Sequence, residues 1–273
     1  MATNEGQVIG GITVTDDCGQ GGYLFAYSRR SQGGEGFVDP LAIPVENEGI
    51  AALAIDRTRQ RVYGLSTVTG TFFVYDLAEG TVALKGTVDD THTFSHLLVL
   101  DKEGNVYGAK VLGELFKYDA EQDTLSPLGV RIPSVAGRQF YNRLDSAALD
   151  EQSGLIYGGG SADGVVFVFD PTAVTVTALG KVTAEPRVRC LTVGLDGRVY
   201  GVAGNENGMG HLFRYDPETR ELADLGIPYS GTDRVWHGYE FDAACTGEFG
   251  EIYLGESDRV SHLFLYFPPV RRR

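Results

Sequence analysis

The chain has 273 residues and carries 37 Asp and Glu against 23 Lys and Arg, a formal net charge of −14 at pH 7. This acidic surplus excludes nucleic acid and anionic membranes as default partners, because both would repel it. The sequence shows no apolar run long enough to cross a membrane and no secretory leader, so we expect a cytoplasmic location. Its three cysteines, Cys18, Cys190 and Cys245, have no paired spacing and predict neither a disulfide framework nor a zinc site.

One phrase recurs six times along the chain. It is a short strand ending in Tyr-Gly or a near equivalent, a polar gap, and a second strand of the form Gly-x-Leu-Phe-x-Tyr-Asp. The copies start at Val8, Val62, Val106, Ile156, Val199 and Ile252. They lie 43 to 54 residues apart, and a repeat of this length built from short strands is typical of a β-propeller.

The other strands of each repeat follow in chain order. Each internal repeat begins with an alternating segment that ends in an acidic turn, as at 51–56, and closes with a fourth short strand, as at 124–129. The two end repeats have three predicted strands each, at 8–14, 22–28 and 37–45 and at 239–245, 251–254 and 261–267. Alternate Leu, Phe and Tyr residues of the third strand are expected to form the core between neighbouring sheets.

These elements predict an all-β chain that forms a single β-propeller domain over residues 1–273. Six copies of the third strand favour six blades, mostly four-stranded and antiparallel, whereas merging of the two end fragments would leave five. Unpaired edge strands at the ends leave a homodimer open. The recurrent Asp76, Asp119, Asp170 and Asp216 follow the third strand and are predicted to form turns, not to act in catalysis.

The segments that precede the first strand of each blade are unusual in composition. Ordinary loops are rich in Ser, Gly, Asn and Asp, but these segments hold three of the five histidines, the sole tryptophan and four arginines. Because the first strand of every blade lines the central channel, we expect these side chains to converge at one channel mouth.

The residue types found there fit proton transfer next to a bound anion. His237 and Tyr239 are the predicted proton-transfer groups, and His96 and Tyr141 are predicted to assist them. The predicted substrate-binding residues are Arg143, Arg187, Arg189, Trp236 and Asn142. Guanidinium groups bind carboxylates, and a tryptophan ring stacks on a sugar. Two alternative roles remain open. Trp236 fits a position in the core between blades equally well, and at least one of Arg187 and Arg189 is expected to form a salt bridge with a neighbouring acid.

Oxygen ligands also occur in the same segments. Glu48, Asp145 and Glu240 are candidate ligands of Ca²⁺ or another divalent ion, although no cofactor is required by the sequence. The repeat, which reads Ala-x-Asp, then Gly-x-Val-Tyr-Gly, then Gly-x-Leu-Phe-x-Tyr-Asp-Pro, resembles the kelch and SMP-30/gluconolactonase-like propellers over nearly the whole chain. In the lactonase branch a channel-bound divalent ion activates water. The resemblance lies in the repeat and matches none of that branch's metal ligands residue by residue.

Three functions therefore stay open for a small-molecule or carbohydrate ligand. The first is an enzyme acting on an anionic small molecule or carbohydrate, most plausibly a lyase that performs β-elimination on a uronic-acid sugar. The resemblance to propeller polysaccharide lyases, which use His, Tyr and Arg, points the same way. The second is a non-catalytic module that binds a glycan or a protein. The third is a metal-dependent, lactonase-like hydrolase. Fold analogy alone does not separate them, because propellers host enzymes and scaffolds alike.

Overall fold

A computed structural model describes residues 2–3, 6–13, 20–29, 36–88, 94–204, 209–231, 235–258 and 260–269, so Cys18 falls outside the described residues. The described chain is almost entirely β-structure and divides into two compact units. The N-terminal unit comprises Met1–Val111 and Leu115–Gly129, and the C-terminal unit comprises Leu112–Glu114 and Val130–Arg273. The two units are described separately below. Within the described residues, no helix has the length and hydrophobicity needed to cross a membrane.

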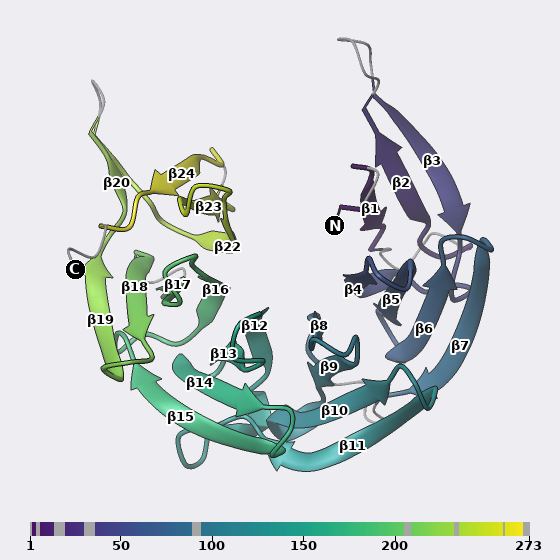
Figure 1. Ribbon diagram of the computed structural model, residues 1–273, viewed down its shortest axis with the longest axis horizontal. Helices are drawn as coiled ribbons and strands as arrows, with labels where there is room; N and C mark the ends of the chain where they lie inside the picture. The colour runs from purple at the N-terminus through teal and green to yellow at the C-terminus, as the bar shows by residue number, and fades with distance from the viewer. Residues whose placement is uncertain are drawn as a thin grey trace. The chain divides into compact units, whose positions relative to one another are not determined.

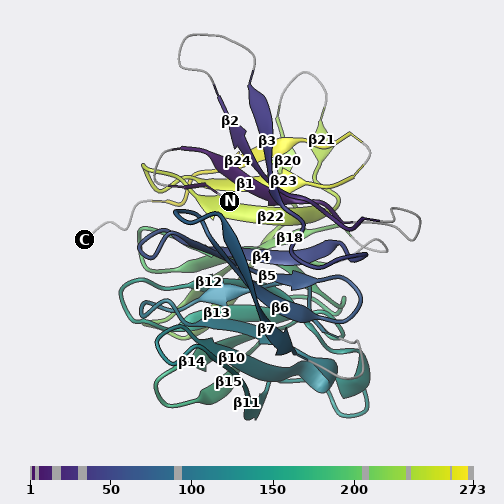
Figure 2. The same ribbon diagram turned by 90° about the vertical axis from the view of Figure 1, so that its right-hand side faces the viewer.

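The N-terminal unit contains three antiparallel sheets, each a simple meander. The first sheet is β1 (Val8–Gly11), β2 (Leu24–Ser28) and β3 (Phe37–Ala42). The second is β4 (Ile50–Asp56), β5 (Arg61–Ser66), β6 (Thr71–Asp76) and β7 (Thr81–Thr87). The third is β8 (Val99–Leu100), β9 (Val106–Ala109), β10 (Glu114–Asp119) and β11 (Thr124–Arg131). Figure 2 looks at this unit from the side of its outer strands, β3 and β7.

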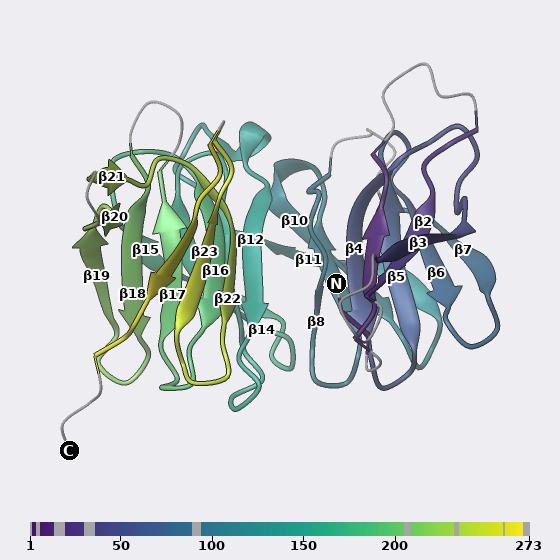
Figure 3. The same ribbon diagram turned by 90° about the horizontal axis from the view of Figure 1, so that it is seen from above.

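The C-terminal unit contains three further meanders and a short hairpin. The first sheet is β12 (Leu144–Leu149), β13 (Ile156–Gly160), β14 (Val165–Asp170) and β15 (Thr175–Lys181). The second is β16 (Val188–Val193), β17 (Val199–Ala203), β18 (His211–Asp216) and β19 (Glu221–Gly226). The third is β22 (Phe241–Thr246), β23 (Ile252–Glu256) and β24 (Leu263–Tyr266). The hairpin of β20 (Tyr229–Ser230) and β21 (Trp236–His237) follows β19 (Figure 3).

The six meanders are the blades of a β-propeller, which confirms the predicted fold class. Besides the two-stranded β20–β21 hairpin, the described residues form six blade sheets and not five, and the first and last blades have three strands, as the sequence predicted. Within each unit the first strand of a blade lies innermost and the last lies outermost (Figure 1). In the C-terminal unit β12 packs beside β16, and β16 packs beside β22. These first strands therefore bring residues from three blades together.

The Tyr-Gly and Leu-Phe halves of the repeat depend on each other. In register, Gly64 of β5 lies opposite Phe73 of β6, and the ring of Phe73 covers the glycine. A Cβ atom on Gly64 would lie 2.1 Å from Cζ of Phe73, and one on Gly158 would lie 2.4 Å from Cζ of Phe167. The glycine is thus required by the close approach of the aromatic ring, and the two sequence signals describe one packing unit.

The recurrent aspartates have the turn-forming role that the sequence predicted. Oδ1 of Asp170 accepts hydrogen bonds from the backbone N–H groups of Thr172 (2.9 Å) and Ala173 (3.0 Å). The same pattern, with acceptance from the residues two and three positions further on, recurs at Asp76, Asp119 and Asp216. Each carboxylate holds the turn between the third and fourth strands of its blade.

Replacing one of these carboxylates tests their role directly. We expect Asp170→Ala to lower the free energy of unfolding by about 1 kcal/mol, because two backbone N–H groups lose their acceptor. Asp170→Asn keeps an acceptor oxygen and should cost less than half as much. Urea unfolding followed by fluorescence measures both variants, and equal losses in the two would contradict this role.

All three first strands of the C-terminal unit carry a β-bulge at the same place. In β12 the register passes from Leu144 opposite Gly160 to Ser146 opposite Gly159, so Asp145 is the extra residue. The equivalent extra residues are Arg189 in β16 and Asp242 in β22. A bulge changes the direction of the side chain that it carries. The fold thus presents one charged side chain at the start of each inner strand in this unit.

Candidate functional site

The bulge residues form a charged cluster in the C-terminal unit, together with Arg187 and Glu240. Arg187 binds Asp145 through two hydrogen bonds of 2.8 Å, from Nε and Nη2. Arg189 lies between two acids, with Nη1 2.6 Å from Glu240 Oε1 and Nε 2.5 Å from Asp242 Oδ1. We call these five residues the acid–arginine cluster. It connects three blades, since its members come from the starts of β12, β16 and β22.

Two features of the cluster show that it is built tightly. Arg187 has a left-handed backbone, with φ of 75°, which is uncommon outside glycine and asparagine and is often found at functional sites. The hydrogen bonds with Asp145 raise the pKa of the Arg187 guanidinium above its ordinary value, so the group stays charged. Arg189 is largely buried. Two arginines against three carboxylates leave the cluster with a net negative charge.

A second group of polar contacts fixes the segment before β22. The carboxylate of Glu256, at the end of β23, is buried. Its Oε1 accepts a hydrogen bond from the backbone N–H of Tyr239 (2.8 Å), and its Oε2 lies 2.7 Å from Nδ1 of His262. Trp236 also donates from Nε1 to Oε2 (3.4 Å), and its ring lies on that of His262, with centroids 4.4 Å apart. Glu256 therefore anchors the chain just before Glu240 of the acid–arginine cluster.

The structure separates the predicted site residues of this unit into three groups. Asp145, Arg187, Arg189 and Glu240 contact one another in the acid–arginine cluster. His237 and Tyr239 are exposed beside the anchored segment, and Tyr141 and Arg143 are exposed at the start of β12. Among the described residues no ion pair to the Arg143 guanidinium is found. Trp236 packs on His262 and is partly buried.

Asn142 does not have the ligand-binding position predicted for it. The side chain is buried, and its Nδ2 donates to the carbonyl of Pro133 (2.9 Å) while its Oδ1 accepts from the backbone N–H of Ala162 (3.2 Å). Both ends of the amide are thus used to hold a loop onto the β13–β14 hairpin. The residue stabilises the fold beneath the site.

Glu48 and His96 belong to the N-terminal unit. Oε2 of Glu48 accepts from the backbone N–H groups of Val68 (3.1 Å) and Thr69 (3.0 Å), so its carboxylate closes the turn after β5. Burial alone would raise the pKa of Glu48, but hydrogen bonds from Ser66, Thr69 and Val68 outweigh it and lower the pKa. His96 is exposed, with its ring centroid 5.6 Å from that of Phe94.

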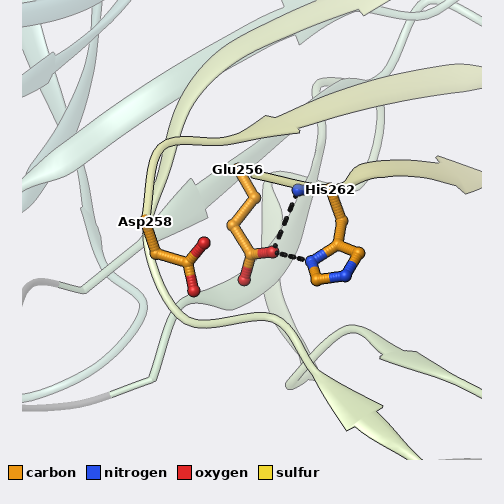
Figure 4. Close-up of side chains that lie close together, drawn as sticks. All are labelled: Glu256, Asp258 and His262. Carbon is orange, nitrogen blue, oxygen red and sulfur yellow. Dashed lines mark hydrogen bonds and ion pairs between the residues drawn. The ribbon is translucent and has the colours of Figure 1, made fainter. Parts of the chain in front are cut away.

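The contacts of Asp145 and Glu240 do not fit the metal-binding role that the sequence predicted for these residues. Asp145 and Glu240 are bound by arginine, and a guanidinium on a carboxylate opposes a second cation there. Among the described residues, ligand atoms of Glu256, Asp258 and His262 lie within 4.8 Å of one another (Figure 4). However, Glu256 already accepts hydrogen bonds at both oxygens, and Asp258 accepts from the backbone of Val260 and Ser261. Glu256 and Asp258 are therefore hydrogen-bonded anchors of the chain.

Sequence reasoning missed Asp242 and Glu256. Asp242 has the same place in its strand as Asp145 and Arg189, so alignment of the first strands, in addition to the segments before them, would have found it. Glu256 stands at the end of the second strand of its blade, and nothing in the repeat distinguishes it. The unit also has an apolar groove of about 210 Å³ between β18, β19 and the last blade, which none of the predicted site residues lines.

The chain is similar in fold to several solved propeller structures. One is a protein with a provisional assignment as a gluconolactonase, which is 13% identical with a TM-score of 0.55 over 78% of this chain and 72% of that one. Another is a structure of a nidogen/laminin complex, 12% identical with a TM-score of 0.58 over 92% and 86% of the two chains. A third is the extracellular domain of a protein assigned as a two-component system from B. thetaiotaomicron. It is 12% identical, with a TM-score of 0.59 over 99% of this chain and 38% of that one.

At these identities the likeness establishes the fold. No protein-family model and no curated protein matches the sequence. The resemblance to gluconolactonase-like propellers noted in the sequence is thus matched by a similar solved structure, whereas the resemblance to kelch propellers stays a prediction.

Proposed function

We propose that the C-terminal unit binds a neutral, polyhydroxylated small molecule at the acid–arginine cluster and hydrolyses its ester, as in a sugar lactone. The observation that carries this proposal is the charge compensation of the cluster. Arg187 and Arg189 are already bound by carboxylates, so the cluster offers alternating donors and acceptors and little positive charge. Hydroxyl groups suit such a surface because they donate to carboxylates and accept from guanidinium groups.

The same observation weighs against the lyase hypothesis. A lyase acting on a uronic acid needs arginines that are open to the substrate carboxylate. Arg187 and Arg189 are bound by acids, and the net negative charge of the cluster would repel that carboxylate even with Arg143 exposed. The fold likeness to a protein assigned as a gluconolactonase supports hydrolysis of a neutral lactone instead.

In this proposal the chain's own side chains move the protons. His237 takes a proton from the attacking water as its oxygen bonds to the lactone carbonyl, and returns it to the ring oxygen as the ring C–O bond breaks. The exposed guanidinium of Arg143 stabilises the negative charge on the carbonyl oxygen. Tyr239 lies beside His237 on the segment that Glu256 anchors.

The test is hydrolysis of D-glucono-δ-lactone and related sugar lactones, followed with a pH indicator after subtraction of the spontaneous rate. We expect saturable turnover, and His237→Ala should lower kcat at least about 10-fold, a loss within the range of general acid–base catalysis. Phe249→Ala, in the exposed turn between β22 and β23, at the other end of β22 from the cluster, should keep full activity. EDTA should have no effect. Absence of turnover and of lactone binding would refute the proposal, and loss of activity in EDTA would replace it with a metal-dependent reaction.

A second candidate is a non-catalytic module that binds the same class of ligand. The exposed aromatic rings of Phe140, Tyr141 and Tyr229 in this unit favour it, because exposed rings commonly stack on sugars and anchor partners. Calorimetry with the lactone and with the open-chain sugar separates the two functions. Binding without turnover identifies the module.

A further inference from the structure

A pair of tyrosines recurs where neighbouring blades of one unit meet. The first tyrosine precedes the glycine of the second strand, and the other lies near the end of the third strand of the next blade. The ring centroids are 5.6, 5.9 and 5.8 Å apart, with interplanar angles of 52°, 50° and 51°, in the pairs Tyr63–Tyr118, Tyr157–Tyr215 and Tyr200–Tyr266. At these three junctions, a ring of one blade therefore packs on a ring of the next.

The junction between the first and second blades has only one of the two rings. Ile9 of β1 lies opposite Ala26 of β2, just as Tyr63 lies opposite a residue of the third strand in its own blade. Ile9 therefore occupies the position of the first tyrosine. The second tyrosine is present as Tyr75 of β6, which is buried in one hydrophobic core with Ile9.

A cavity of about 180 Å³ lies against the residues that would surround the missing ring. Ile9, Ala26 and Tyr75 line it, together with the partly buried Leu41 and Leu77. All of its lining residues belong to the N-terminal unit, and the cavity is formed by that unit alone. An apolar cavity of roughly 150 Å³ holds one benzene molecule. The volume therefore fits a single aromatic ring with a small substituent.

The cavity also has polar groups that suit a hydroxyl on that ring. The polar side chains of its lining include Thr3, Gln7, Asp39 and Gln60. In other blades the tyrosine before the glycine donates its hydroxyl to an acid, as Tyr200 does to Asp196 (2.8 Å). Asp39 provides an acid in this cavity, and a carboxylate accepts a hydrogen bond from a phenol. The lining thus offers a partner for each part of a phenol.

We propose that this cavity binds a small phenol, which takes the place of the missing tyrosine ring. The ring of the ligand packs on Tyr75, and its hydroxyl donates to Asp39. Aromatic rings favour tilted or offset contacts with centroids about 4.5–7 Å apart, the geometry that the three tyrosine pairs have. The acid–arginine cluster belongs to the other unit, so this inference does not depend on the proposed function.

Calorimetric titration of the full chain with p-cresol tests the proposal. We expect one molecule to bind per chain with a dissociation constant of about 1 mM or lower, which is within the range for a ligand of this size. Toluene keeps the ring without the hydroxyl, and 4-methylcyclohexanol keeps the hydroxyl without the aromatic ring. Each should bind at least about 10-fold more weakly than p-cresol.

Ile9→Tyr is the decisive variant, because it restores the ring that the other junctions have. The new side chain should fill the cavity and lower the affinity for p-cresol at least about 10-fold. Ile9→Val leaves the cavity open and should keep the wild-type affinity. Asp39→Ala removes the acceptor of the hydroxyl, so its affinity for p-cresol should fall close to that for toluene, whereas its affinity for toluene should not change.

Circular dichroism checks that each variant is folded. Should Ile9→Tyr fail to fold, Ala26→Leu extends another lining residue into the cavity and should cause the same loss of binding. A wild-type chain that does not bind p-cresol at millimolar concentrations would overturn the proposal. Undiminished binding in a folded cavity-filling variant would do the same, because it would place the ligand elsewhere.

Discussion

Gly64→Ala is expected to lower the free energy of unfolding by about 3 kcal/mol, the upper part of the range for overpacked cores. The added Cβ would lie 2.1 Å from Cζ of Phe73, and the ring of Phe73 is fully buried between the first and second blades. The ring therefore cannot move aside without disturbing its neighbours. Urea unfolding of the purified variant measures the loss.

Two further variants make this result specific. Gly231→Ala adds a Cβ where no heavy atom lies within 4 Å, and it should change the free energy of unfolding by less than about 0.5 kcal/mol. Phe73→Leu in the Gly64→Ala background frees space above the new methyl group. The double variant should therefore lose less free energy of unfolding than the sum of the losses in the two single variants. Full additivity would show that the glycine and the ring do not interact.

Arg189→Met is expected to lower the free energy of unfolding by about 2 kcal/mol. Removal of one partner from a buried ion pair leaves an uncompensated charge and costs roughly 3–5 kcal/mol, but Asp242 is half exposed, so solvent reduces the loss here. Glu240 and Asp242 would then lie side by side without a cation. Binding of the lactone should weaken in parallel, because the cluster loses its central donor.

Salt dependence distinguishes this electrostatic cause from lost packing. The deficit of Arg189→Met should shrink between 0.05 and 0.5 M NaCl (about 14 and 4 Å in Debye length), because screening relieves the repulsion between the two acids. Arg138→Met removes an exposed arginine from the same unit and should cost less than about 0.5 kcal/mol. A deficit for Arg189→Met that is independent of salt would assign the effect to packing.

The sequence predicts the blades well because the same local contacts recur in successive blades. The Gly–Phe contact and the Asp turn are local, so a short phrase specifies them without knowledge of the partner strands. The six blades and the three-stranded ends follow from the same phrase. The β20–β21 hairpin was not predicted, since its strands have only two residues each and no alternation.

The candidate site is less predictable because it depends on pairing across blades. At least one of Arg187 and Arg189 was expected to form a salt bridge. Both do, because the bulges place an acid beside each, but the partners could not be named from the sequence. A bulge is a change of register by one residue, which becomes visible only when the partner strand is known. The burial of Asn142 likewise depends on the loop that contains Pro133.

The bulge positions have a consequence for how this architecture can acquire new specificities. Asp145, Arg189 and Asp242 lie outside the strand ladders, and in the N-terminal unit the corresponding bulge in β4 carries Ala51. Substitutions there leave the hydrogen bonds between strands unchanged, so each such blade contributes one interchangeable position. Libraries randomised at these few codons should yield folded proteins with altered ligand preference far more often than libraries randomised elsewhere on the inner strands.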